Sequence, residues 1–270
     1  MKNIRLMVTL LALSATTAMS AQVMTDNDIL NADLQRLMQQ GSRRSVAQYA
    51  PNSGLVAHYE FDNNCNDLSG NNNNGQLKGA ATYANGMLGG QQNTCLSLGG
   101  PGNPGCVRVA NSSSMALTGQ WTIATFVKMR SERHMDGWGR TTHGGSGTII
   151  AKDHDRSGFC ILASLKDGKF SVWMGGPSAG GGASASLEGV YANQWVHVAY
   201  TYNNGEYRVY LNGKLKTTKS ARPDFRQANG RDLYLGKFSD TWYPLDGYLD
   251  DVRLYNRCLS AEEIAALAEM

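Results

Sequence analysis

The stretch WVHVAYTYNNGEYRVYLNGKL, residues 195–215, decides the fold class of this chain. Apolar and aromatic side chains alternate with others on both sides of Asn-Asn-Gly at 203–205, which is the pattern of two half-buried β-strands. Asn and Gly tolerate the positive φ angles that a tight hairpin turn needs. A second turn signal, Asn-Gly-Lys, follows at 212–214. The stretch therefore predicts an antiparallel hairpin after which the chain turns again.

Short alternating segments of the same kind recur on both sides of this hairpin. Two of them are separated by Lys-Asp-Gly at 166–168, another hairpin signal. Closely spaced strands with almost no helix between them favour an all-β, antiparallel β-sandwich over an alternating α/β fold. The segments are 55–61, 106–110, 121–129, 147–152, 159–165, 169–174, 232–238 and 248–255.

The composition is that of a globular protein. Of the 270 residues, 41% are hydrophobic and 17% are charged, and the net charge is +3. Loss of Lys2 and Arg5 with a leader would leave 23 basic against 22 acidic residues, a balance of +1. Such a balance gives no reason to expect a nucleic acid or an anionic membrane as partner.

Residues 1–20 have the pattern of a secretory signal peptide. Lys2 and Arg5 precede a short apolar run at 6–13, and small residues follow up to Ser20. The run is too short to span a bilayer, and no later stretch is long and apolar enough to do so. The sequence therefore predicts an exported protein that is secreted, periplasmic or on the cell surface.

Residues 21–53 are predicted to form a short amphipathic helix and a linker. The helix either packs on the following domain as a spacer or serves as a small oligomerisation element. Its apolar positions recur at helical spacing: Ile29, Leu30, Leu34, Leu37 and Met38.

A second helix is predicted at the carboxyl end, in SAEEIAALAEM, residues 260–270. Ser260 is a good N-cap and Glu263 follows three residues later, which together form a capping box. We expect this helix to cover an edge or corner of the sandwich.

Five cysteines are compatible with disulfides in an exported chain. Cys95 and Cys106 flank the Gly- and Pro-rich stretch LSLGGPGNPG. If that stretch is a hairpin loop, the two cysteines lie opposite each other, and we predict a disulfide between them. The pairing of Cys65, Cys160 and Cys258 cannot be read from the sequence.

With the strands placed, two stretches resemble the laminin-G-like, concanavalin A-like jelly-roll domains of bacterial exported proteins. They are the opening GLVAHYEFDNNCNDLSGNNNNG (54–75) and the closing LDGYLDDVRLYNRCLSAEEIAAL (245–267). The strands between them resemble those of the family in the same order. The resemblance implies a single jelly-roll β-sandwich over 54–270. It says less about function, because this fold carries lectins, adhesion domains, glycosidases and lyases.

A calcium site is predicted from oxygen-bearing side chains. Calcium takes carboxylate, amide and carbonyl oxygens, and several lie between residues 62 and 69. The resemblance implies that the first and last strands are close, which would bring the acids at 250 and 251 to the same place. A cation would relieve the repulsion between these carboxylates. The predicted ligands are Asp62, Asn64, Asp67, Asp250 and Asp251, with only one of the last two pointing at the ion because strand neighbours face opposite ways.

The alternative interpretation of the same residues involves no metal. The Asp and Asn side chains would then cap turns, and Asp251 would pair with Arg253. The run Asn71 to Asn74 is assigned to backbone turns under either interpretation.

No catalytic motif is evident. Jelly-roll glycosidases carry a run of alternating acids on one strand, and the nearest sequence here, Glu60-Phe61-Asp62, lacks the third acid. His197 lies within a strand pattern and is expected to be structural.

The predicted ligand-binding loop is RSERHMDGWGRTTHGGSG, residues 130–147. An indole can stack on a sugar ring while acids, Arg and His bind its hydroxyls. The candidates are Asp136, Trp138, Arg140 and His143, with Trp242 near the last strand. Trp121, Trp173 and Trp195 are assigned to the core because each lies within an alternating strand.

These patterns predict a non-catalytic extracytoplasmic recognition domain that binds carbohydrate and holds a structural calcium ion. Two alternatives remain open from the sequence. One is a carbohydrate hydrolase or lyase with a divergent site, and the other is an adhesion or structural module that binds a protein.

Overall fold

The computed structural model describes residues 51–87, 93–117, 119–135, 141–143, 146–152, 159–175, 183–220, 230–237 and 243–270. The predicted signal peptide and most of the segment 21–53 lie outside these ranges. In the part of the chain that is described, no helix has the length and apolar character to cross a membrane.

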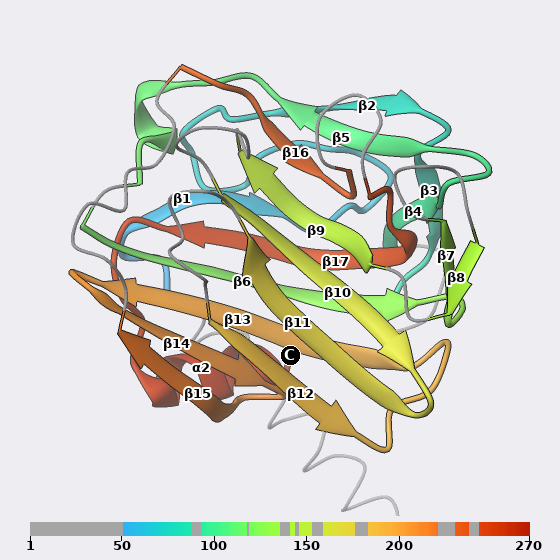
Figure 1. Ribbon diagram of the computed structural model, residues 1–270. Helices are drawn as coiled ribbons and strands as arrows, with labels where there is room; N and C mark the ends of the chain where they lie inside the picture. Colours follow the sequence, from blue (N-terminus) through green and yellow to red (C-terminus); the bar gives the residue numbers. More distant parts are fainter. Residues whose placement is uncertain are drawn as a thin grey trace, which may run out of the picture. The chain divides into compact units, whose positions relative to one another are not determined.

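The strands form two packed antiparallel sheets, as predicted (Figure 1). We call them sheet A and sheet B. Sheet A has the order β15 (Lys214–Ser220), β14 (Glu206–Leu211), β13 (Trp195–Asn203), β6 (Gln120–Met129), β17 (Asp246–Tyr255), β4 (Thr94–Gly99) and β3 (Thr82–Asn85), with β1 (Leu55–Tyr59) also paired to β17.

Sheet B lies in front of sheet A in Figure 1. Its order is β12 (Ser184–Glu188), β11 (Lys169–Gly175), β10 (Phe159–Lys166), β9 (Ser146–Lys152), β16 (Leu233–Leu235), β5 (Gly105–Val109) and β2 (Gly75–Gly79). A separate ribbon pairs β7 (Arg133–Met135) with β8 (Thr141–His143), and a 3-10 turn, η1, spans Ser113–Met115.

Aromatic side chains fill the space between the sheets. Trp121 of β6 is fully buried, as predicted, and stacks on Phe159 of sheet B with 6.0 Å between ring centroids and on Tyr202 at 5.7 Å. Large aromatic rings bury much apolar area and gain further from stacked or edge contacts. This contact therefore ties the two sheets together.

The turn residues adopt the conformations that their sequences indicate. Asn204, Asn212 and Asp167 have φ angles of 42°, 48° and 51°. These values lie in the left-handed region, where Asn and Asp are tolerated better than most residues. The predicted hairpins β13–β14 and β10–β11 and the following turn into β15 are confirmed.

The carboxyl-terminal helix α2 (Ala261–Ala268) packs on the outward face of sheet A. Ser260 and Glu263 form the predicted capping box. Ile264 and Leu267 are buried in a cluster with side chains of β6, β13 and β14. The helix therefore shields part of a sheet face that would otherwise contact water.

The predicted Cys95–Cys106 disulfide is not present. The stretch between these cysteines is not a hairpin loop, because β4 belongs to sheet A and β5 to sheet B. The Gly- and Pro-rich segment instead carries the chain from one sheet to the other. All five cysteines lie in the described ranges, and none of them is disulfide-bonded.

Close packing of β17 against β6 leads to a prediction about Gly247. A Cβ at this position would lie 2.3 Å from the carbonyl oxygen of Lys128, so Gly247→Ala must push the two strands apart. We expect a loss of about 1–3 kcal/mol in the free energy of unfolding, measured by urea denaturation.

Gly102→Ala is the matched control, because a Cβ there meets no atom within 4 Å. Equal stability of Gly247→Ala and the wild type would show that the pairing of these strands does not limit stability.

Candidate functional site

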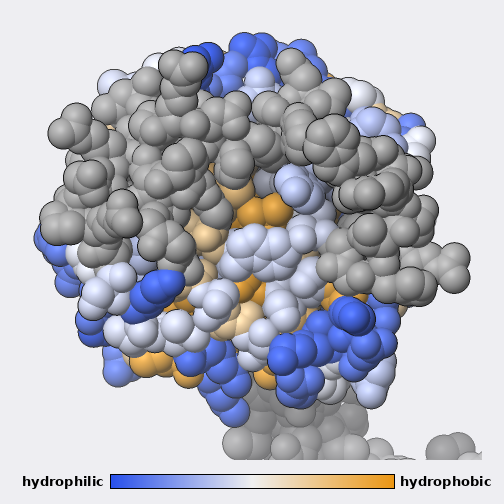
Figure 2. Space-filling view, viewed as in Figure 1, coloured by the Kyte–Doolittle hydropathy of each residue, from blue (hydrophilic) through white to orange (hydrophobic). Residues whose placement is uncertain are grey.

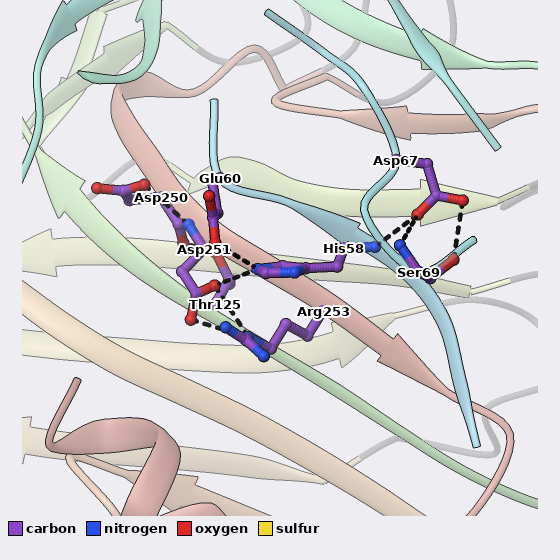
Figure 3. Close-up of polar contacts among 8 residues, drawn as sticks. All are labelled: His58, Glu60, Asp67, Ser69, Thr125, Asp250, Asp251 and Arg253. Carbon is purple, nitrogen blue, oxygen red and sulfur yellow. Dashed lines mark hydrogen bonds and ion pairs between the residues drawn. The ribbon is translucent and has the colours of Figure 1, made fainter. Parts of the chain in front are cut away.

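The oxygen-rich loop after β1 is held by Asp67. Its carboxylate accepts hydrogen bonds from the backbone N–H groups of His58 (3.0 Å), Ser69 (2.9 Å) and Asn73 (2.9 Å), and from the Ser69 hydroxyl (2.9 Å). The contacts with His58 and Ser69 are drawn in Figure 3. Asp67 thus organises the loop and joins it to β1 through hydrogen bonds within the protein, as the turn-capping alternative predicted.

Asn64 also has a local role. Its side-chain amide donates to the carbonyl of Asp62 at 2.7 Å, and its Oδ1 accepts the backbone N–H of Asn66 at 2.8 Å. Its oxygen is used within the turn, as in an Asx-turn.

The carboxylate of Asp251 contacts two basic side chains (Figure 3). Its Oδ1 lies 2.7 Å from Nε2 of His58 and 2.9 Å from Nε of Arg253. Burial alone would raise the pKa of Asp251, but the hydrogen bond from His58 and the charge of Arg253 outweigh burial and hold the pKa below its usual value. The pairing with Arg253 is the one that the metal-free alternative predicted.

A β-bulge explains how Asp250 and Asp251 acquire different surroundings. The pairing of β17 with β6 shifts register between Asp250 and Arg253, and Asp251 has a φ of 47°. A bulge inserts an extra residue and redirects side chains. Simple alternation along the strand therefore does not hold here.

Asp250 is buried and accepts hydrogen bonds from the backbone. Asp250 is 5% exposed and accepts the backbone N–H of Asp251 at 2.9 Å and of Met87 at 3.3 Å. Burial, with smaller contributions from the charges of Asp251 and Asp62, raises the pKa of Asp250 to about 7, against these hydrogen bonds.

Asp62 links the segment after β1 to the start of β4. Its Oδ1 accepts the backbone N–H of Thr94 at 2.8 Å, and the Thr94 hydroxyl donates to the carbonyl of Phe61 at 2.5 Å. Among the five predicted metal ligands, the charge of Asp62 reaches Asp250 and contributes to raising the pKa of Asp250. Within the described residues, no group of three or more His, Cys, Asp or Glu side chains is placed to hold a metal ion.

His197 is buried, and the charges of Asp251 and Arg253 act on it. Its ring lies 4.9 Å from that of Phe126, and its Nδ1 has no hydrogen-bond partner in the described part of the chain. Burial lowers the pKa of His197 to about 4, which the charge of Asp251 opposes and that of Arg253 reinforces. The imidazole is therefore neutral at neutral pH and packs as part of the fold.

Most residues of the predicted ligand loop lie outside the described ranges. These are Asp136, Trp138 and Arg140, and Trp242 does as well. His143 ends β8, where its backbone pairs with that of Arg133. The prediction that these residues form one ligand-binding site therefore stays a prediction.

The core assignment of Trp173 and Trp195 is wrong. In β11 the side chains of Phe170, Val172 and Met174 are buried in the core, so Trp173 points away from it on the outward face of sheet B. The alternation Phe-Ser-Val-Trp-Met contained this signal, because it places Trp173 on the same face as Ser171. Trp195 likewise precedes the core residue Val196 and shares the face of His197.

Trp173 belongs to an apolar cluster that we call the sheet B patch. Trp173 and Tyr243 are partly buried and pack against Ala151, Cys160 and Leu162. Figure 2 shows apolar and weakly polar residues at the centre of this side of the molecule. In the next row of the sheet, Ser171 pairs with Ser186 and with Ser164, and the hydroxyls of Ser171 and Ser186 are 2.9 Å apart. The patch thus combines an aromatic surface with hydroxyl groups.

Comparison with known proteins identifies the family. The family described as the concanavalin A-like lectin/glucanases superfamily matches residues 101–265, more than half of the chain. The chain therefore belongs to this superfamily. No curated protein sequence matches it.

Several solved structures share the fold. Domain 4 of AbnA, a GH43 extracellular arabinanase from Geobacillus stearothermophilus in complex with arabinotriose, is 25% identical, with a TM-score of 0.58 over 79% of this chain and 98% of that one. The binding domain of Paraclostridial Mosquitocidal Protein 1 is 19% identical, with a TM-score of 0.60 over 80% of this chain and 52% of that one.

The binding domain of botulinum neurotoxin DC, in complex with rat synaptotagmin II, is 16% identical, with a TM-score of 0.56 over 80% of this chain and 51% of that one. The chain thus spans about half of each toxin domain and nearly all of the arabinanase domain.

The burial of His197 leads to a prediction about acid stability. Because its folded pKa is about 4 and an exposed His titrates near 6.5, the unfolded state binds the proton first. The stability that depends on neutral His197 is fully present above pH 6.5 and is lost as the pH falls toward 4. We expect His197 to account for about 3 kcal/mol of this loss.

The measurement is urea unfolding of the wild type and His197→Phe at pH 7 and pH 4. The variant keeps a ring beside Phe126 but cannot be protonated. It should lose less stability than the wild type on acidification, and an equal loss in both proteins would contradict the assignment.

Proposed function

We propose that this chain is a non-catalytic carbohydrate-recognition domain that acts outside the cytoplasm and binds glycans through the sheet B patch. The observation that carries the proposal is Trp173, an aromatic side chain on the outward face of sheet B that is supported from beneath by Cys160 and Leu162. Aromatic surfaces stack on the apolar faces of sugar rings, and few, well-placed polar groups fix orientation. The serine hydroxyls beside the patch provide such groups.

Membership of the concanavalin A-like superfamily supports a binding role, as does the likeness to an arabinanase domain whose structure contains arabinotriose. The pattern of a signal peptide in residues 1–20 supports action outside the cytoplasm.

The lack of a catalytic role is supported by the side chains around the patch. Glycosidases place two carboxyl groups across the scissile bond. Within the strands β9, β10, β11 and β12 as described, Glu188 carries the one carboxylate, and it is exposed and pairs with Lys169 at 3.0 Å; Asp167 lies in the turn between β10 and β11. We therefore propose that the patch binds sugars without cleaving them.

We also propose that a calcium ion binds at Asp62 and Asp250. These two carboxylates supply hard oxygens, and the pKa of Asp250 is raised mainly by burial, so a cation would stabilise its charged form. The bound ion would supply positive charge and would link the segment after β1 to β17. Asn64 and Asp67 are not included, because their side chains organise the turn, and Asp251 is not included, because Arg253 balances its charge.

Glycan binding is tested by an array that includes arabino-oligosaccharides, followed by calorimetry on any ligand found. Trp173→Ala should weaken binding at least about tenfold, because stacking is lost, whereas Trp173→Phe should retain part of it. Tyr191→Ala is the control, because Tyr191 is an exposed aromatic residue outside the patch. Failure to bind any glycan, or full affinity in Trp173→Ala, would overturn the proposal.

The calcium site is tested by thermal melts at pH 8 in EDTA and in millimolar calcium. Calcium should raise the Tm of the wild type. Asp250→Asn should be more stable than the wild type in EDTA, by less than about 4 kcal/mol, because a buried charge is removed while the amide nitrogen can no longer accept one of the two backbone N–H groups. This advantage should shrink as the pH falls from 7 toward 4, where Asp250 becomes protonated in both states.

In the same melts, Asp250→Asn should not respond to calcium. Asp67→Asn should be less stable but should still respond, since Asp67 holds the loop and not the ion. The site is refuted by a wild-type Tm that is insensitive to calcium or by a calcium response that survives in Asp250→Asn.

A further inference from the structure

The outward face of sheet A carries a row of side chains that the proposed glycan site does not use. Trp195 of β13 pairs directly with Lys128 of β6, Lys128 pairs with Tyr248 of β17, and Tyr248 pairs with Ser97 of β4. Their neighbours along the strands, such as Val196 and Leu249, are buried in the core. The row therefore faces away from the core, across four adjacent strands (Figure 1). All four side chains are partly exposed.

Two cations are held against the aromatic rings of this row. The ammonium of Lys128 lies 4.6 Å from the ring centroid of Trp195 and 4.4 Å from that of Tyr248. The guanidinium of Arg130 lies 4.7 Å from the same Tyr248 ring. Cation–π contacts of this kind hold long basic side chains in defined positions.

The two cations differ in what else they contact. Arg130 forms an ion pair with Asp246 and donates to the carbonyl of Leu98 at 2.9 Å. Lys128 forms no ion pair with any described residue, and its contacts are the two rings. Ring faces attract a cation but are poor partners for its three N–H donors. The ammonium therefore retains donors and positive charge for an anionic partner.

We propose that this row is a second binding site, and that its ligand is a sugar bearing a carboxylate, such as a uronic acid residue. The carboxylate accepts hydrogen bonds from Lys128, with the hydroxyl of Ser97 in the same row, and the sugar ring lies against Trp195. Charge-assisted hydrogen bonds to a carboxylate are among the stronger polar contacts in proteins. A neutral sugar would leave the charge of Lys128 uncompensated.

An acidic peptide fits this surface less well. Extended peptides commonly bind by adding a strand to an open sheet edge. The row lies on β13, β6, β17 and β4, all of which have strand neighbours on both sides in sheet A. The backbone groups at the row are therefore used within the sheet, and a peptide would have only side-chain contacts.

The test is calorimetry of the full chain with tetragalacturonate at low and at moderate salt. We expect binding that weakens with salt, and weak or no binding of a neutral galactose tetrasaccharide. Lys128→Met keeps the stem but removes the charge, and should lower affinity about tenfold or more. Lys128→Arg should restore most of it. Lys166→Met, which removes an exposed lysine of sheet B, should have no effect.

Thermal melts establish that each variant folds. The proposal is overturned if tetragalacturonate does not bind, if Lys128→Met binds it normally, or if tetraglutamate binds as tightly. Trp173→Ala separates the two sites: it should abolish binding at the sheet B patch and leave tetragalacturonate binding intact. Loss of tetragalacturonate binding in Trp173→Ala with normal binding in Lys128→Met would place acidic sugars on sheet B and would overturn this inference alone.

Discussion

The pairing of β17 with three other strands is the constraint on which the rest of this structure depends. One edge of β17 pairs with β6 along much of its length. Its other edge is shared, because residues 246–249 pair with β4 and residues 252–255 pair with β1. The last strand of the domain is thus held in the middle of sheet A by β1 and β4, which come from its amino-terminal part. The bulge at Asp250 and Asp251 lies where β4 gives way to β1.

This junction gives two adjacent acids opposite properties. Asp251 faces His58 and Arg253, and their positive charge and hydrogen bonds keep its pKa low. Asp250 has backbone N–H groups as its partners, and burial keeps its pKa high. Burial penalises the charge of both carboxylates, so the difference comes from the partners that the bulge provides. The same region therefore contains a satisfied ion pair and an incompletely compensated carboxylate.

The three tryptophans in the described residues lie in three different environments. Trp121 joins the sheets in the core, whereas Trp173 and Trp195 lie on the outward faces of sheet B and sheet A. The surroundings of the two outward residues differ in charge. Trp173 lies over apolar side chains near serines, and Trp195 lies against the ammonium of Lys128. A neutral ligand suits the first surface and an anionic ligand suits the second.

The sequence by itself determined the fold class, the hairpins at Asn204 and Asp167 and the capping box at Ser260, because local alternation and turn residues encode these features. The jelly-roll family was indicated separately, by the resemblance of residues 54–75 and 245–267 to that family. It did not reveal β2, β3 or β12, which are short and polar, because pairing in the sheet and not side-chain pattern creates them. Only the tertiary structure decided which partners Asp250 and Asp251 have, since the bulge in β17 breaks the two-residue period on which the expectation rested. It likewise decided that Cys95 and Cys106 lie in different sheets, because a loop of given composition can either reverse the chain or carry it across the sandwich.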